Sequence, residues 1–417
     1  MKVRRSALCL NIRVLIEYVL VFFVIMDGNT VYNASAEYNF HFRILCLVLS
    51  IILVIYTLVH SKLKKSALVM SIALFLYFGV YFIFQYENCY QEAYSCLYII
   101  GIPLLLLYFT MAYKGNDVNS LFYKLEKVVL FISVLSLILW LLCCVLKLFV
   151  TNSFMIVNWG QTKRIDGYFG LQFITQIDNT YLSGLVRNTS FFCEAPMFNL
   201  WLDIALAVEL FLKSQSSKIK IVILTITIVT TTSTTGVIFI VLCVALRYYL
   251  IYESTKYKYR ILLTIVMLFF APFLISIIQA VIGLKGQTSS YLIRMQDYVA
   301  GFQVWLQNPI FGSGFGNTAS LYGYVYESLA GNVGFSNYIT ALLSTGGIWN
   351  FICYALGIII PCFRRKKQTH LNVTCFIICY AFLTVTTSFY MRYIAAIFIA
   401  YGLSYLCAGK IIDRSMV

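Results

Sequence analysis

Residues 217–252 read SKIKIVILTITIVTTTSTTGVIFIVLCVALRYYLIY, and the number of times that this stretch crosses a bilayer decides the fold. It has no charge between Lys220 and Arg247, so one long helix or two short helices would fit. With a single crossing every later segment would change sides, and the basic run 364–367 would face outward, against the positive-inside tendency. We therefore predict two short spans joined by the hydroxyl-rich turn 230–236.

The composition of the whole chain is that of a polytopic membrane protein. Of its 417 residues, 61% are hydrophobic and 11% are charged, and the mean hydropathy is +0.85. These values lie far outside the range of soluble globular domains. A helix needs roughly 17–25 apolar residues to cross a bilayer. We predict an all-α integral membrane protein, one domain over 1–417, with about twelve transmembrane helices near 8–26, 43–59, 67–85, 93–112, 128–150, 196–212, 217–231, 235–252, 261–282, 336–360, 372–389 and 393–408.

The distribution of Lys and Arg orients these spans. With both termini cytoplasmic, the predicted inner segments hold 22 of the 31 Lys and Arg residues and the outer segments hold 8. The net charge of +15 is then explained by topology and by attraction to anionic membrane lipid, so it does not indicate a nucleic-acid partner. Two long hydrophilic stretches, 151–195 and 283–335, become extracytoplasmic loops on the same face. We expect them to form the functional site.

Basic residues are scarce in the predicted outer segments, and the arginines there are candidates for substrate binding. A planar guanidinium suits bidentate recognition of phosphate or pyrophosphate. An anionic, lipid-linked substrate is therefore one interpretation. Pairing with outer carboxylates, or contact with lipid headgroups, is the other. The four arginines are Arg164, Arg187, Arg294 and Arg392.

The end of the first outer stretch leads directly into the sixth predicted span. Pro196 is suited to the first turn of a helix, where its missing N–H would be unpaired anyway. The positive helix N-terminus would then lie near Arg187 and favour an anion. Glu194 lies at the same corner. We expect Glu194 either to act as general base toward a sugar hydroxyl or to hold Arg187 in place.

Three polar residues that are predicted to lie within the membrane are further candidates for substrate binding. Asp203 lies on the helical face of Asn199, and a buried acid there is either functional or held by a structural hydrogen bond. Ser233 and Thr234 lie in the turn between the two short spans. They are predicted either to line a polar cavity or to bond back to helix carbonyls.

The second outer stretch begins with an amphipathic segment, residues 294–306, whose apolar spacing predicts a helix lying on the membrane. The segment Pro309–Gly314 follows, and its glycines permit close approach of another group. Because no strand precedes these glycines, they do not predict a nucleotide site. The outer carboxylates lack paired spacing, so we expect no metal and no cofactor.

The order of these motifs resembles the Wzy-type polymerases of O-antigen and capsular polysaccharide, which are related to O-antigen ligases. Family members carry an Arg, a Phe-rich Glu-Pro-like corner that starts a span, and a Ser/Thr-rich turn after the next span. Their second outer loop runs from an Arg to a Pro-x-x-Gly-x-Gly segment, then to His-Asn and a span with Gly-Ile. The matching residues here are Arg187, Phe191-Phe192, Glu194-Ala195-Pro196, Ser233–Gly236, Arg294, Pro309–Gly314, Ser336-Asn337 and Gly347-Ile348, with Ala195 inserted.

The resemblance implies a glycosyltransferase of the bacterial cytoplasmic (inner) membrane, active in lipopolysaccharide or capsule synthesis. It would transfer a growing glycan from undecaprenyl pyrophosphate onto a lipid-linked repeat unit, with a chain-length regulator as candidate partner. Arg187 and Arg294 would hold the pyrophosphate, and Arg164 and Arg392 are second choices. Asn337, with the hydroxyl-rich turn, would shape the cavity.

Two other functions remain open. An O-antigen ligase is less favoured because Ser336 stands where ligases generally use a functional histidine. A lipid-linked oligosaccharide flippase or other transporter would also have twelve spans. Transporters place charges near the midplane of matching halves, whereas the polar residues here gather in two unequal outer stretches.

Overall fold

The computed structural model describes residues 12–38, 40–61, 63–114, 118–178, 184–254, 289–324, 335–363 and 368–407. Within these ranges the chain is mostly helical, as predicted. Three of the helices continue through π-helical segments. In chain order the helices are α1 (Ile12–Met26), α2 (Phe42–His60), α3 (Lys65–Phe84), α4 (Gln91–Tyr94) leading through Ser95–Gly101 into α5 (Ile102–Lys114), α6 (Ser120–Leu139) extended by Trp140–Val145, α7 (Ala195–Ala207) extended by Val208–Leu212, α8 (Lys218–Thr230), α9 (Thr234–Ser254), α11 (Ser289–Gln307), a 3-10 helix (Ala319–Tyr324), α12 (Tyr338–Phe363), α13 (Gln368–Thr386) and α14 (Tyr393–Cys407).

Seven helical segments among the described residues are long and apolar enough to cross a membrane. Residues 217–252 form two helices, as predicted: α8 ends at Thr230 and α9 begins at Thr234. The predicted span 261–282 lies outside the described residues. The seven segments are Phe42–His60, Lys65–Phe84, Gln91–Ala112, Ser120–Val145, Ala195–Leu212, Thr234–Ile251 and Tyr338–Phe363.

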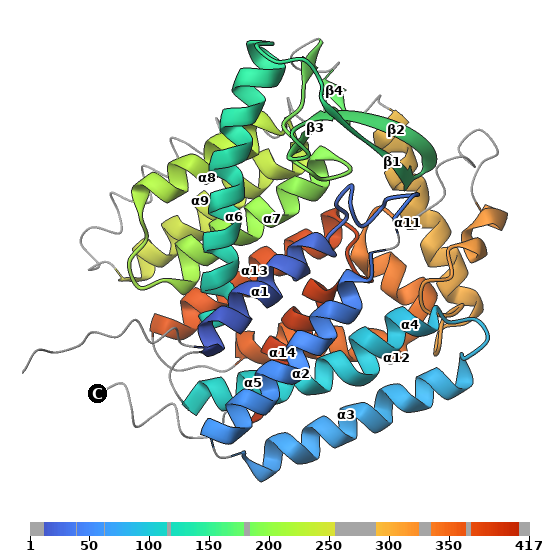
Figure 1. Ribbon diagram of the computed structural model, residues 1–417. Helices are drawn as coiled ribbons and strands as arrows, with labels where there is room; N and C mark the ends of the chain where they lie inside the picture. The colour runs from blue at the N-terminus through green and yellow to red at the C-terminus, as the bar shows by residue number, and fades with distance from the viewer. Residues whose placement is uncertain are drawn as a thin grey trace, which may run out of the picture.

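The first outer stretch contains β-structure that the all-α prediction missed. Strands β1 (Ser153–Trp159), β2 (Gln161–Tyr168) and β3 (Gln172–Phe173) form one antiparallel sheet. Strands β4 (Ile177–Asp178) and β5 (Leu185–Val186) form a second. Gly160 closes the β1–β2 hairpin with a φ of 70°, a conformation that glycine adopts without steric cost. The sheets lie beside the upper part of α6 and above α7 in Figure 1.

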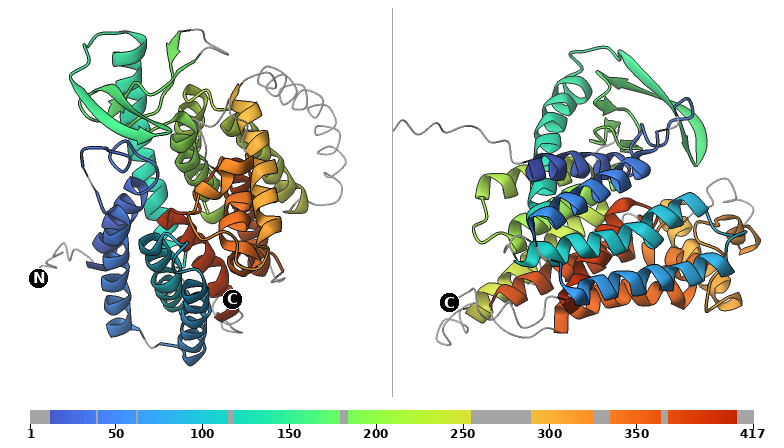
Figure 2. Two further views of the ribbon diagram at one scale, coloured as in Figure 1. Left: turned by 90° about the vertical axis from the view of Figure 1, so that its right-hand side faces the viewer. Right: turned by 60° about the horizontal axis from the view of Figure 1, so that its bottom comes forward.

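The connecting segments predicted to be outside meet at one end of the helical body, here called the loop end. Backbone hydrogen bonds join segments far apart in sequence: Val31 N–H donates to Phe191 O (2.9 Å), and Tyr90 N–H donates to Phe315 O (2.8 Å). The first and last described residues lie at the opposite end, away from the strands (Figures 1 and 2). These contacts bring together, at the loop end, segments that the sequence predicted to lie on one face, while the number of crossings stays a prediction.

Helix α14 is the central element of the body. Every residue of Tyr393–Cys407 is buried except Leu406. It packs closely against α12, because Gly402 lies directly over the carbonyl group of Gly357. Small residues allow this backbone approach, which is a main source of packing energy between helices in a membrane. A side chain at Gly402 would force the two helices apart.

Helix α12 is broken at Gly347, where φ is 63° and ψ is −172°. The segment Pro309–Gly314 occupies the break: Ile348 N–H donates to Pro309 O (2.9 Å), and Gly314 N–H donates to Thr345 O (3.0 Å). Gly312 and Gly314 have φ values of 69° and 106°. Backbone groups freed by the break are thus paired within the protein, as non-helical backbone at membrane depth requires.

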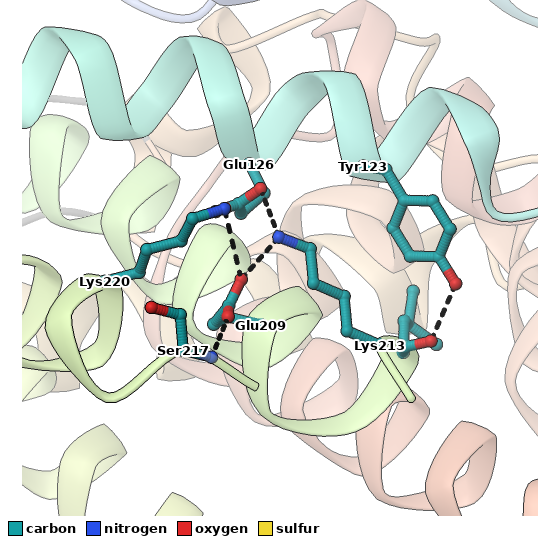
Figure 3. Close-up of polar contacts among 7 residues, drawn as sticks. Tyr123, Glu126, Glu209, Lys213, Ser217 and Lys220 are labelled. Carbon is teal, nitrogen blue, oxygen red and sulfur yellow. Dashed lines mark hydrogen bonds and ion pairs between the residues drawn. The ribbon is translucent and has the colours of Figure 1, made fainter. Parts of the chain in front are cut away.

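Ion pairs fix helices at the opposite end. Glu126 of α6 and Glu209, at the end of α7, are buried and share two lysines (Figure 3). Lys213 Nζ lies 2.6 Å from Glu126 and 2.5 Å from Glu209, and Lys220 Nζ lies 3.2 Å from Glu126. Ser217 N–H also donates to Glu209 (2.6 Å). Since the charges balance, this cluster joins α6, α7 and α8 without leaving a buried carboxylate unpaired.

We expect Gly402→Ala to lower the thermal unfolding temperature of the detergent-solubilised protein, because the added Cβ collides with the Gly357 carbonyl of α12. Overpacking of this kind costs about 1–3 kcal/mol. Gly79→Ala in α3 is the matched control, since nothing lies within 4 Å of its added Cβ. Equal unfolding temperatures for the two variants would contradict the close α12–α14 contact.

Candidate active site

A cavity of about 600 Å³ opens at the loop end between segments that are far apart in sequence. The β1–β2 hairpin contributes Trp159, Gly160 and Lys163, and the start of α7 contributes Glu194, Pro196 and Met197. Helix α11 contributes Ile293, Arg294 and Asp297. The turn between α13 and α14 contributes residues 386–392, and Asn29, Gln176, Thr318, Phe335 and Ser336 complete the lining. Both predicted outer stretches therefore meet at one site.

Glu194 is held at the cavity wall by the hairpin. It is the residue before α7, with extended backbone (φ −150°, ψ 154°), and Pro196 follows in the first turn. The indole N–H of Trp159 donates a hydrogen bond to one of its carboxylate oxygens. The hairpin turn at Gly160 directs Trp159 and Lys163 toward the same cavity. This arrangement places one carboxylate and one ammonium at the start of a helix, where the dipole favours an anion.

Arg392 is positioned by a buried carboxylate from the other end of the chain. Asp27, 1% exposed, follows α1, and its Oδ1 lies 3.9 Å from a guanidinium nitrogen of Arg392 and 3.9 Å from one of Arg43. Its Oδ2 accepts a 2.7 Å hydrogen bond from the backbone N–H of Tyr393. Asp27 thus fixes the start of α14, while the side chain of Arg392 lines the cavity.

Arg294 and Asp297 lie one helical turn apart on α11 and both line the cavity. Asp297 is 5% exposed. Burial raises the pKa of its carboxyl group to about 6, against the opposing influence of the Ser336 hydroxyl, the Ser336 backbone N–H and the charge of Arg294. A carboxyl group with this pKa changes its charge near neutral pH.

Arg187 lies elsewhere, beside the hydroxyl-rich turn. Its Nε donates to the carbonyl of Thr231 (2.8 Å), where α8 ends, and Asn188 N–H donates to Thr230 O (3.1 Å). Carbonyls at a helix C-terminus lack intrahelical partners, and a cation there also complements the helix dipole. Arg187 is not among the residues that line the cavity. In this structure it joins the first outer stretch to the α8–α9 turn.

The other predicted polar residues pack within the protein. Asp203 is fully buried, and Asn199 Nδ2 donates to its Oδ2 at 2.6 Å. Ser233 is 2% exposed, and its backbone N–H donates to Thr231 Oγ1 (3.3 Å). Thr231 itself bonds back to the carbonyl of Ile228 (2.7 Å). Neither Asp203, Ser233 nor the adjacent Thr234 is among the cavity-lining residues.

Two further predicted residues have local partners. Asn337 caps α12, because its Oδ1 accepts bonds from the N–H and hydroxyl groups of Thr340 (2.9 and 2.8 Å). Arg164 lies on β2, 63% exposed, paired with Asp166 at 2.9 Å and placed over the ring of Phe154. Of the nine predicted site residues, the cavity therefore brings together Glu194, Arg294 and Arg392.

The sequence prediction left out three residues that carry charge at this site. Asp297 carried a readable signal, since it lies three positions after Arg294 and so on the same face of a helix. Lys163 depends on the β1–β2 hairpin, and Asp27 depends on contacts with residues 43 and 392. No local pattern marks those two.

No protein-family model matches the chain, and no curated protein matches it either. The chemistry of the site therefore follows from its residues. Three cations, Lys163, Arg294 and Arg392, and two carboxyl groups, Glu194 and Asp297, share one cavity. Such a site can bind a phosphate-containing group and exchange a proton with a hydroxyl. No cluster of three or more potential metal ligands occurs among the residues that the structure describes.

We expect Asp27→Asn to destabilise the protein by about 3 kcal/mol, because it leaves Arg43 and Arg392 near each other without their shared carboxylate. The measurement is thermal or denaturant unfolding in detergent. Asp166→Asn is the matched control: it removes an exposed ion pair, worth at most about 1 kcal/mol. Similar losses in both variants would contradict the anchoring role of Asp27.

Proposed function

We propose that this chain is a membrane-embedded polysaccharide polymerase. It transfers a growing glycan from undecaprenyl pyrophosphate to a lipid-linked repeat unit at the outer face of the bacterial cytoplasmic membrane. The observation that carries the proposal is the cavity at the loop end, where both outer stretches and the α13–α14 turn bring three cations and two carboxyl groups together. The motif resemblance supports the same function.

The cations suit a pyrophosphate leaving group. Glycosyl transfer from a polyprenyl pyrophosphate releases negative charge, and fixed positive groups stabilise it in the transition state. Arg392 is held by Asp27, and Arg294 projects from a helix, so both are supported by rigid elements. Lys163 adds a third charge from the hairpin. We assign Arg294 and Arg392 to the pyrophosphate, with Arg187 supporting the turn.

The remaining lining suits a sugar. A cavity of about 600 Å³ is within the usual range for ligand sites. Asn29, 4% exposed, lines it, and its Oδ1 has no hydrogen-bond partner among the described residues. A buried carbonyl oxygen of this kind is normally satisfied by a donor. The neutral amide of Asn29 thus adds a polar group beside the charged residues of the cavity, as a site for sugar hydroxyls requires.

The outer surface of α11 suits a substrate with a lipid tail. Five apolar side chains on it are about half exposed and recur every three or four residues, so they share one helix face. The same helix contributes Arg294 and Asp297 to the cavity. A polyprenyl chain in the bilayer would therefore lie near the charged site. The five side chains are Leu292, Met295, Val299, Phe302 and Leu306.

We expect Arg294→Ala and Arg392→Ala to reduce the products of the cell to single repeat units, because the leaving pyrophosphate loses a cationic partner. The measurement is the repeat-unit ladder of extracted glycans on a gel. Arg164→Ala is the matched control, since its exposed side chain lies over Phe154, outside the cavity. It should keep the full ladder.

The same experiment separates the competing functions. If lipid-linked units accumulate on the inner leaflet in the two variants, transport is the function. If polymer forms at normal length but is no longer attached to its final acceptor, the chain is a ligase. A full ladder in both variants, with protein at normal abundance, would contradict any role of the cavity in polymerisation.

We expect an exposed cysteine at the loop end to react with a membrane-impermeant maleimide in intact cells. Gln161→Cys in the β1–β2 hairpin should be labelled, whereas Gln215→Cys at the opposite end should be labelled only after lysis, because both residues are exposed. The parent protein measures background, since its described cysteines are buried or nearly so. Labelling of Gln215→Cys alone would reverse the proposed orientation.

A further inference from the structure

The carboxyl groups of the cavity have different surroundings. Glu194 precedes α7, and one of its oxygens is occupied by the indole N–H of Trp159. That bond ties the hairpin to the start of a helix, which is a positioning contact. Asp297 projects from the middle of α11, is 5% exposed and lines the cavity together with Ser336 and Arg294. The two groups are therefore suited to different tasks.

We propose that Asp297 is the general base of the transfer reaction and that Glu194 is a positioning residue. This inference rests on the proposed polymerase function and adds to it the identity of the group that receives the proton. Ser336, the neighbour of Asp297, occupies the position at which the resemblance places a histidine in ligases.

The step balances as a single displacement. The acceptor hydroxyl oxygen forms a bond to the anomeric carbon of the donor sugar, and the bond from that carbon to the pyrophosphate oxygen breaks. The electron pair of the broken bond leaves on the pyrophosphate, next to Arg294 and Arg392. The hydroxyl proton passes to the Asp297 carboxylate, which later releases it to water at the cavity opening. No oxidant, metal or further reactant is needed.

The surroundings of Asp297 match this role. A base works best when its pKa lies near the operating pH, because it must be charged before the step and able to hold the proton after it. Burial raises the pKa of Asp297 to about 6. Arg294, one turn away on α11, favours the charged form and also faces the leaving group. Proton acceptance and charge stabilisation are thus placed on one rigid helix.

The charged and polar groups that line the cavity with Asp297 come from several elements. Arg294 is on its own helix, Ser336 precedes α12, Arg392 precedes α14, and Glu194 and Lys163 come from the first outer stretch. Bound pyrophosphate would add negative charge and raise the pKa of Asp297 further. The three cations oppose that effect. Activity should therefore rise with pH through a region near 6.

The test uses full-length protein in detergent and, as substrate, lipid-linked repeat units extracted from cells that lack this chain. The readout is the rate of formation of lipid-linked dimers from pH 4.5 to 9. The unsubstituted protein should lose activity as the pH falls below about 6. Asp297→Asn should lower kcat about 10²–10⁴-fold, with little change in KM, and should abolish this dependence on pH. Asp297→Glu should restore part of the rate.

Two variants make the outcome specific. Asp166→Asn, at an exposed position outside the cavity, should keep both the rate and the pH profile. Glu194→Gln should keep the loss of activity below pH 6, even where its rate is lower. Normal polymerisation by folded Asp297→Asn, or loss of the acidic limb only in Glu194→Gln, would overturn the assignment. If Arg294→Ala and Arg392→Ala are also fully active, the proposed function itself fails.

Discussion

The buried carboxylate of Asp27 is the contact on which the loop end depends. It lies between two guanidinium groups and accepts the backbone N–H of Tyr393, so it joins the end of α1 to the starts of α2 and α14. Burying a carboxylate is costly unless its charge is compensated, and here several elements provide that compensation together. The opposite end follows the same rule. Glu17 is fully buried between Arg13 (2.8 Å) and Lys124 (2.7 Å), and the Glu126–Glu209 cluster fixes α6 to α8.

The ion pairs at the opposite end stabilise the helices, whereas most charged groups at the loop end line the cavity. In a bilayer, lipid tails are as apolar as leucine, so helices gain little from hydrophobic burial and depend on close packing and polar contacts. Gly402 over Gly357 is one such contact, and the paired carboxylates are others. At the loop end, Arg392 takes part both in a stabilising ion pair and in the proposed site. It pairs with Asp27, and 23% of its side chain stays exposed in the cavity.

Apolar periodicity and charge asymmetry predicted the helices well, because both follow from the bilayer itself. The α8–α9 turn was predicted from the placement of a distant basic run, not from residues 230–236 alone. The strands of the first outer stretch were missed because the hairpin carries many polar residues and is half exposed, although Gly160 between two segments with β-branched residues was a usable signal. Glu194 and Arg294 were found from local motifs. Arg187 was assigned to the substrate, but its contact with the Thr231 carbonyl requires knowledge of how the loop folds back.

The break in α12 has a consequence for how the chain is made. Its free backbone groups bond to Pro309, Ile310 and Gly314, which leave the ribosome before the helix does. The segment Pro309–Gly314, which fills the break in α12, is therefore synthesised before the helix that it binds. The two halves of α12 reach their final positions only when the backbone around Gly347 binds this earlier segment. Placement of α12 therefore depends on a protein contact as well as on lipid. Biogenesis of the final helices is tied in this way to the conformation of the Pro309–Gly314 segment.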